Sequence, residues 1–274
     1  MAKSPRALAV TSGKGGVGKS CIALNLGVTL ARGGQRILLV DADLGKGNLA
    51  ILTGIAPRYT IESVLAGACT SADAIVEDME VLGPGVALLP AASGARGETW
   101  PPALGALGVA EDIGQGFDLV IVDTAAGVDR HAVEFAAGAD DLLVVVTPEP
   151  TSIADAYATL KVILDRRSDM GLGLLVNMAD PADDPERIQG AFQQMATRFL
   201  GAQIDNRGYI PFDRSVREAT RQQTPFALAN RLTPAGAAIE ELAADLSDLE
   251  GCPPIPGPGF LERVLQPHLI ESIP

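Results

Sequence analysis

A short segment rich in glycine and lysine offers the clearest chemistry in the chain. Residues 13–20 read Gly-Lys-Gly-Gly-Val-Gly-Lys-Ser, directly after an apolar run and directly before an apolar helical pattern. Glycines let such a loop curve so that its N–H groups face phosphate oxygens, and the N-terminus of the following helix adds partial positive charge. In this G-x-x-x-x-G-K-S pattern Lys19 reaches the β- and γ-phosphates and Ser20 is a ligand of Mg²⁺. The segment therefore predicts a nucleotide site with Mg²⁺.

A second lysine in the loop, Lys14, stands where an ordinary phosphate loop accepts almost any residue. Two of the five lysines of the chain lie in this loop. A lysine this early in the loop points away from its own phosphates, so we expect it to reach a phosphate bound by a facing subunit of a homodimer held together by ATP. We expect the nucleotide to be contacted around the loop by Gly13, Lys14, Gly15, Gly16, Val17, Gly18, Lys19, Ser20 and Cys21.

Aspartates follow two of the apolar runs. Asp41 and Asp43 form a D-x-D pair at the end of one run, and Asp123 ends another in a Walker B arrangement. Because alternate residues of a strand share a side, Asp41 and Asp43 could both face the phosphates, and one of them could orient the attacking water. Asp123 would hold Mg²⁺ through a water, and Gly127 would let the next loop respond to the γ-phosphate. The alternative for either strand end is an aspartate that caps the following turn.

Strand-length apolar runs alternate with helical patterns, which is typical of a parallel sheet covered on both faces. We expect an α/β fold with a doubly wound, mostly parallel sheet of seven to eight strands. Ligands of such sheets bind at the carboxyl ends of the strands, where the phosphate loop also lies. The predicted strands are Ala7–Val10, Arg36–Asp41, Val86–Pro90, Leu119–Asp123, Leu142–Thr147, Leu172–Asn177 and one ending at Ile210. The predicted helices are Cys21–Arg32, Ile61–Ala66, Ala103–Ile113, Arg130–Ala137, Thr151–Arg167, Pro185–Leu200, Arg214–Gln222 and Pro234–Leu246.

Composition limits the classes of function. With 274 residues, 47% of them hydrophobic and 20% charged, the chain can form a large folded domain. A net charge of −13 disfavours general attraction to nucleic acid or anionic lipid. The three cysteines are widely spaced and lack C-x-x-C spacing, which indicates reduced thiols and argues against a metal cluster. We expect no signal peptide and no membrane-spanning segment, and therefore a cytoplasmic protein, peripheral to the inner face of a membrane at most.

Together these motifs resemble the MinD/ParA class of deviant Walker A P-loop ATPases, and within it the flagellar-number regulators of the FlhG and FleN type. The resemblance covers roughly residues 6–247. Its D-T-A-A-G and T-P-E-P-T-S blocks favour the flagellar branch over the cell-division and chromosome-segregation branches. The motifs are K-G-G-V-G-K-S at 14–20, L-V-D-A-D-L at 39–44, V-D-T-A-A-G at 122–127, T-P-E-P-T-S-I-A-D-A-Y at 147–157, V-N-M at 176–178 and I-P-F-D-R-S-V-R-E-A at 210–219.

This resemblance implies an ATPase that dimerises around ATP and Mg²⁺. By the family pattern Lys14 crosses the dimer, Asp43 serves hydrolysis in switch I, Asn48 lies near the nucleotide and Asn177 reads adenine. The catalytic residues would be Lys14, Lys19 and Asp43, and the metal ligands Ser20 and Asp123. The segment expected to close over the base is Pro211, Phe212 and Asp213.

Two departures from the family pattern matter. Switch I carries Lys46 and Gly47 where this branch usually has apolar or small residues, so the switch could be more mobile or could place another cation near phosphate. Flagellar members also usually carry an N-terminal glutamine-containing motif that stimulates a partner GTPase, and nothing before the first predicted strand matches it. The resemblance therefore does not imply GTPase activation.

The chain is expected to end in a short tail. We assign residues 1–250 to a P-loop ATPase domain and residues 251–274 to a Pro/Gly spacer and an amphipathic tail. Burying the apolar face of the tail in lipid could contribute about 6–12 kcal/mol, whereas ordering its backbone costs about 8 kcal/mol or more. One tail is marginal, but two tails on a dimer could bind a membrane cooperatively. The alternative is packing on its own domain or on a protein partner. The apolar face at helical spacing is Phe260, Leu261, Val264 and Leu265.

A stripe of arginines raises DNA as an alternative partner. Arg214, Arg217 and Arg221 fall on one face of a predicted helix, with Arg207 and Arg231 flanking it. Because the chain is acidic overall, we favour a solvated face or an acidic partner over DNA.

The prediction is an ATP-dependent dimerisation switch with slow Mg²⁺-dependent hydrolysis, which regulates the placement or number of flagella or a related polar assembly through a protein partner. Two alternatives stay open: a DNA-associated partitioning ATPase, and an ATP-sensing regulator of a transcription factor with negligible turnover. An iron–sulfur carrier is disfavoured because no cysteine falls in the loop after Asp123 or in a paired motif.

Overall fold

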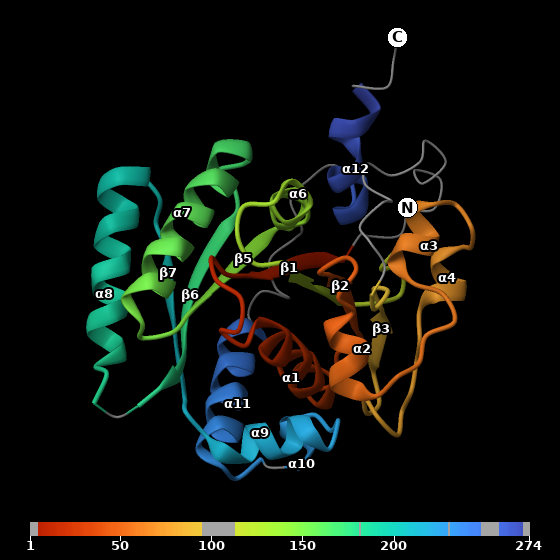
Figure 1. The fold of residues 1–274 in the computed structure, drawn as a ribbon, viewed down its shortest axis with the longest axis horizontal. Coiled ribbons are helices and arrows are strands. Elements are labelled where there is room, and N and C mark those ends of the chain that lie inside the picture. Colours follow the sequence, from red (N-terminus) through yellow and green to blue (C-terminus); the bar gives the residue numbers. More distant parts are fainter. Residues whose placement is uncertain (1–4, 95–112, 181, 230, 248–257, 271–274) are drawn as a thin grey trace.

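A computed structural model shows a twisted sheet with helices on both faces (Figure 1). The structure describes residues 5–94, 113–180, 182–229, 231–247 and 258–270. Within them seven strands pair in the order β3-β2-β4-β1-β5-β6-β7, and every pair is parallel. The predicted doubly wound parallel α/β fold is confirmed. The strands are β1 (Arg6–Thr11), β2 (Ile37–Ala42), β3 (Val86–Leu89), β4 (Leu119–Thr124), β5 (Asp141–Val146), β6 (Gly171–Ala179) and β7 (Asp205–Pro211).

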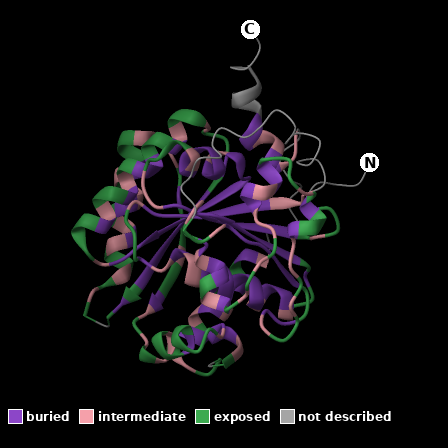
Figure 2. Cartoon of the chain, turned by 45° about the vertical axis from the view of Figure 1, so that its right-hand side comes forward, coloured by how far each residue is buried: buried purple, intermediate pink, exposed green. Residues whose placement is uncertain are grey.

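Helices bury both faces of the central strands, and exposed residues lie mainly on the outer sides of the helices (Figure 2). Every residue of β2, β4 and β5 is buried, which explains why their sequences are continuous apolar runs. One face packs on α1 (Lys19–Arg32), α2 (Asn48–Thr53), α9 (Arg214–Arg221), α10 (Phe226–Ala229) and α11 (Pro234–Ser247). The other packs on α3 (Ile61–Leu65), α4 (Ser71–Ala74), α6 (Arg130–Gly138), α7 (Pro150–Arg166), α8 (Pro185–Met195) and α12 (Phe260–Ile270).

Several helices differ from the predicted ones. The first begins at Lys19 because Gly18, with φ 95°, turns the chain directly into it. Helices α2, α4 and α10 were not predicted, since four to six residues are too few for a helical period to show. The predicted single helix 185–200 changes at Ala196 into a π-helical turn. The predicted helix 103–113 lies outside the described residues apart from Ile113.

The tail helix α12 packs against α6, and its apolar face is part of the core (Figure 1). Phe260, Leu261, Val264 and Leu265 are each at most 6% exposed, and the ring of Phe260 lies 6.3 Å from that of Phe135. Of the two alternatives that the sequence left open, membrane binding and packing on its own domain, this conformation shows the second, and the packing covers the apolar face. None of the described helices is long and apolar enough to cross a bilayer.

An arginine fixes this helix at one place. Arg263 donates to the carbonyl oxygens of Gly138 and Pro258 at 2.6 and 2.8 Å, and to the buried carboxylate of Asp140 at 3.1 Å. A Cβ on Gly138 would come within 2.5 Å of Val264 Cγ2. The approach of α12 to α6 therefore depends on the absence of a side chain at residue 138.

This close approach gives a stability prediction. Gly138→Ala should lower the free energy of unfolding by about 1–3 kcal/mol, because the added methyl group overpacks the contact with α12. Urea unfolding measures this change in the free energy of unfolding. The matched control is Gly190→Ala in α8, where a Cβ meets nothing within 4 Å and helix propensity should stabilise the chain slightly. Equal effects of the two substitutions would show that α12 is not packed on α6.

Candidate nucleotide site

Three adjacent strands bring their carboxyl ends, and the predicted site residues, to one edge of the sheet. In the register of β2 and β4, Asp41 lies opposite Asp123, and Asp123 in turn pairs with Val10 at the end of β1. The phosphate loop follows β1 at this same edge. The sequence-based placement of the site at the carboxyl ends of the strands agrees with this arrangement.

The phosphate loop is held tightly by its neighbours. A Cβ on Gly13 would overlap the backbone of Asp155 in α7, so only glycine fits there. A Cβ on Gly18 would lie 2.4 Å from Nδ2 of Asn177, and that nitrogen donates to the carbonyl oxygen of Val17 at 2.7 Å. Gly15 and Gly16 face open space. The loop is thus fixed at its two ends and open in the middle, as binding of phosphate requires.

The residues expected to hold Mg²⁺ lie around a buried carboxylate. Both carboxylate oxygens of Asp123 are buried and have no hydrogen-bond partner of normal geometry among the described residues. Burial raises the pKa of Asp123 to about 7, and the nearby Ser20 hydroxyl and Lys19 oppose this rise. A buried carboxylate without a partner is costly, and a divalent cation with oxygen ligands would satisfy it. Ser20 and Asp123 therefore fit a Mg²⁺ site.

Lys19 and Lys14 occupy contrasting positions although both come from the loop. Lys19 is buried, and burial lowers its pKa against the opposing charges of Asp123 and Asp43. The side chain of Lys14 is 43% exposed, and its Nζ contacts Oε2 of Glu149 at 2.7 Å. Lys19 thus points into its own site, and Lys14 lies at the surface beside α7.

The two aspartates of the D-x-D pair have different surroundings. Asp41 accepts the backbone N–H groups of Asp43 and Leu49, at 3.2 and 2.9 Å, so its carboxylate fixes the backbone around switch I. Burial, and next the charge of Asp123, raises the pKa of Asp41 well above its usual value. Asp43 instead accepts side-chain donors: Nδ2 of Asn48 at 2.8 Å and Nζ of Lys46 at 3.2 Å. The partners of Asp43 are thus side chains, whereas those of Asp41 belong to the backbone.

A cavity of about 400 Å³ beside the loop suits a base. Its walls include Gly18, Cys21 and Asn177, as well as the predicted closing segment Pro211, Phe212 and Asp213. The thiol of Cys21 is buried, which raises its pKa to about 11 and keeps it neutral there. Asp213 is on the wall, but its carboxylate accepts the N–H groups of Ser215 and Ala235, at 2.8 and 3.3 Å. That carboxylate is therefore engaged in holding α9 and α11 instead of facing a base.

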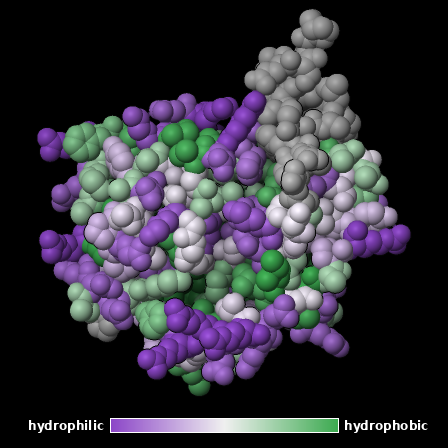
Figure 3. Space-filling view, viewed as in Figure 1, coloured by the Kyte–Doolittle hydropathy of each residue, from purple (hydrophilic) through white to green (hydrophobic). Residues whose placement is uncertain are grey.

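The arginine stripe is divided between different surroundings. Figure 3 shows hydrophilic side chains gathered over α9. Arg217 and Arg221 line the base cavity, and Arg217 stacks 5.4 Å from the centre of the Phe212 ring. The flanking Arg207 is ion-paired with Asp205 and Asp245, and Arg231 with Glu240. These contacts engage several of the arginines that the DNA alternative would need for phosphate, which further disfavours that alternative.

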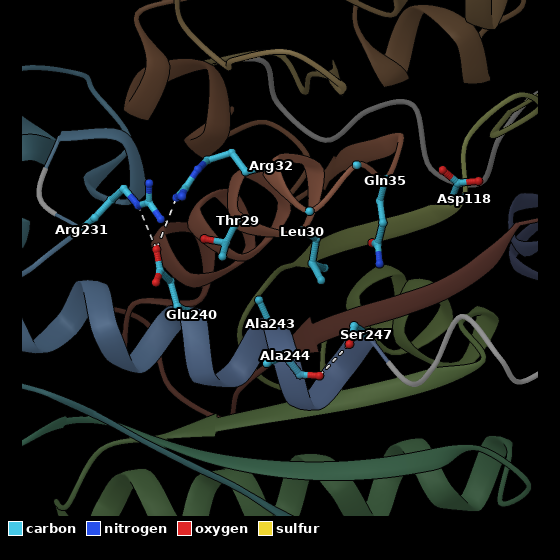
Figure 4. Close-up of a pocket in the computed structure, with 12 residues that line it drawn as sticks. Thr29, Leu30, Arg32, Gln35, Asp118, Arg231, Glu240, Ala243, Ala244 and Ser247 are labelled. Atoms are coloured by element: carbon cyan, nitrogen blue, oxygen red, sulfur yellow. Dashed lines mark hydrogen bonds and ion pairs between the residues drawn. The ribbon is translucent and has the colours of Figure 1, made fainter.

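A wider cavity of about 660 Å³ lies away from this chemistry (Figure 4). It is at the amino ends of β2 and β4, between α1 and α11, at the opposite edge of the sheet from the phosphate loop. Both arginines on its wall, Arg32 and Arg231, contact Glu240, at 3.5 and 2.9 Å. It is not part of the nucleotide site.

Three residues near the site were missed in the sequence. Met178 lines the base cavity with φ 57° at a register shift between β6 and β7. Glu62 accepts the N–H groups of Gly45 and Ala92, at 3.1 and 3.0 Å, and so fastens switch I to the loop after β3. Glu149 pairs with Lys14. Met178 and Glu149 carried a signal, since they belong to the V-N-M and T-P-E-P-T-S blocks, whereas Glu62 carried none.

Comparison with known proteins identifies the family of the chain. The model of a ParA family, described as NUBPL iron-transfer P-loop NTPase, matches residues 3–247. The antiactivator FleN of Pseudomonas aeruginosa is 37% identical over 220 residues, covering 79% of this chain and 77% of FleN. The septum site-determining protein MinD of Synechocystis is 32% identical over 248 residues, covering 88% of this chain and 89% of that protein.

Solved structures of related proteins share this fold. The cell division ATPase MinD of Pyrococcus furiosus is 26% identical with a TM-score of 0.74, covering 89% of this chain and 99% of that chain. MinD of Pyrococcus horikoshii, solved in complex with Mg-ADP, is 25% identical with a TM-score of 0.75, covering 90% and 98%. The chain thus belongs to the ParA/MinD family of P-loop NTPases, and it is an ATPase that uses ATP and Mg²⁺.

Proposed function

We propose that this ATPase is a dimerisation switch: ATP joins two copies, slow hydrolysis separates them, and the state of the switch regulates the placement or number of flagella or a related polar assembly. The flagellar part of the proposal is supported by the similarity to FleN. The proposal includes a cytoplasmic location and a protein partner that recognises the dimer.

The main support for the proposed dimer is the position of Lys14. Its ammonium group leaves its own loop and lies at the surface, where it contacts two exposed side chains, Glu149 and Thr151, at 2.7 and 3.5 Å. An exposed ion pair of this kind contributes about 0–1 kcal/mol, so a facing phosphate can displace Glu149 at little cost. A copy related by two-fold symmetry would present such a phosphate to each Lys14.

Within one subunit, the remaining residues have separable tasks. Lys19 would neutralise the β- and γ-phosphates, and Ser20 and Asp123 would hold Mg²⁺, which bridges phosphate oxygens and neutralises charge. Asp43, oriented by Asn48, would accept a hydrogen bond from the attacking water and align it with the γ-phosphorus. Asn177 holds the loop through Val17 and forms part of the base cavity. The donation from Gly127 N–H to the Ser12 carbonyl, at 2.9 Å, joins the Walker B loop to the phosphate loop.

A second candidate function is favoured by the word antiactivator in the name of FleN. In it, ATP binding alone makes the chain competent to restrain a transcription factor, and turnover is negligible. The two functions differ in whether hydrolysis is needed to end the restraint. Blocking hydrolysis would change the number of flagella if the chain is a dimerisation switch, and would leave that number unchanged if ATP binding alone is sufficient.

The cellular test replaces the gene in its own organism with the Lys14→Ala or the Asp43→Ala form and counts flagella by electron microscopy. We expect the Lys14 variant to resemble a deletion, because it cannot form the dimer. The Asp43 variant should show the opposite change in number, because its dimer persists. Normal flagella in a deletion strain would contradict the flagellar role, and a normal Asp43 strain would favour the antiactivator without turnover.

A further inference from the structure

The switch I lysine, Lys46, makes an unusual contact for an exposed side chain. Its Nζ lies 3.2 Å from Oδ1 and 3.3 Å from Oδ2 of Asp43. The side chain of Lys46 is 64% exposed, whereas that of Asp43 is 8% exposed. A solvated cation therefore covers the outer side of the carboxylate that faces the nucleotide site.

The backbone that carries Lys46 is fastened on both sides. Glu62 accepts the N–H of Gly45 at 3.1 Å, and the carbonyl oxygen of Gly45 accepts the N–H of Gly94 at 3.0 Å. Gly47, with φ 55°, leaves no room for a side chain, because a Cβ there would lie 2.5 Å from Oγ of Ser93. Lys46 can therefore exchange partners by rotating its own side chain, with the loop held in place.

The contact with Asp43 brings the charge of Lys46 to the edge of the sheet that carries the site. Asp43 follows β2 at the edge where Asp41 lies opposite Asp123, and Nζ of Lys46 contacts both of its carboxylate oxygens. A third cation thus lies beside the position proposed for the γ-phosphate, in addition to Lys19 and the Lys14 proposed to come from a facing copy.

We propose that Lys46 is a specificity residue for the γ-phosphate: it pairs with Asp43 in the absence of a γ-phosphate and moves to that phosphate when ATP binds. This proposal rests on the proposed roles of the site. The exchange involves no covalent step. When Lys46 leaves, Nδ2 of Asn48 still holds Oδ2 of Asp43 at 2.8 Å, and Oδ1 becomes free to accept a water. ADP has no γ-phosphate, so it leaves Lys46 on Asp43 and the carboxylate covered.

Binding measurements test this assignment. Lys46→Met keeps most of the length of the side chain and removes its charged ammonium group. We expect it to weaken binding of the non-hydrolysable ATP analogue AMP-PNP by about tenfold to a hundredfold, as for loss of a hydrogen bond to a charged group. Its affinity for ADP should change by less than about twofold, since ADP does not engage Lys46. Lys46→Arg should keep most of the preference for AMP-PNP. Titration calorimetry with Mg²⁺ present gives all of these affinities.

Two controls make the result decisive. Lys161→Met removes another exposed lysine, near the far end of α7, and should change neither affinity. Repeating the series on the Lys14→Ala chain removes any contribution of ATP-dependent dimers to the affinities. The experiment can therefore refute the contact of Lys46 with the γ-phosphate separately from the proposed dimer. Equal weakening of AMP-PNP and ADP by Lys46→Met would show a merely structural role. No weakening of either would show that the lysine stays on Asp43 throughout, and either result overturns the proposal.

Discussion

Replacing Lys14 with alanine is expected to lower the rate of ATP hydrolysis by about 10³-fold or more, the range found for a cation supplied by a second protein in other phosphoryl transfers. The affinity of the isolated subunit for ATP should be nearly unchanged, because Lys14 points to Glu149 at the surface and not into its own loop. Phosphate release gives the rate and calorimetry gives the affinity.

Lys19→Ala is expected to act on binding, in contrast to Lys14→Ala, which is expected to act on the rate. Lys19 is buried beside Asp123 and Asp43, so its loss should weaken the binding of ATP itself. The separation of the two effects, rate for Lys14 and affinity for Lys19, is what the arrangement of the loop implies. If Lys14→Ala hydrolysed ATP at the normal rate, the proposed action across a dimer would be refuted.

Asp43→Ala is expected to slow hydrolysis by about 10²- to 10⁴-fold while ATP stays bound, because loss of a group that orients water affects the reaction and not the affinity. The variant should accumulate with ATP in its site. Phosphate release in single-turnover experiments measures the loss. Asp165→Ala, which removes an exposed carboxylate on α7, is the matched control.

A normal rate for Asp43→Ala would move the water-orienting role to Asp41 or elsewhere. The structure gives a reason to place it at Asp43. Asp41 already accepts two backbone N–H groups, so its removal should disturb the backbone of switch I as well as the chemistry.

The parts of the fold and site that the sequence predicts depend on local pattern. The runs before Asp41 and Asp123 could be assigned to buried parallel strands because both faces of such strands are covered and the residues are apolar throughout. Parallel strands bring their carboxyl ends together, so the order of apolar runs and polar ends was enough to assign the phosphate loop and both aspartates to one edge of the sheet.

The parts that the sequence does not predict depend on contacts between distant segments. The amphipathic pattern of Phe260 and its neighbours is equally suited to lipid and to a protein surface, and only the packing on Gly138 decides between them. The spacing of Arg217 and Arg221 indicates one helix face, but not that the base cavity lies beneath it. Glu62 lies in a short helix, and its bond to Gly45 joins two loops whose proximity no periodicity reveals.

The central claim is that ATP joins two copies of this chain through Lys14, and the most direct test is the molar mass in solution. Light scattering on the Asp43→Ala chain with Mg²⁺ should give twice the monomer mass with ATP and the monomer mass with ADP. Adding Lys14→Ala to that chain should return it to the monomer mass with ATP still bound. A monomer in ATP, or a dimer that persists without Lys14, would contradict the account.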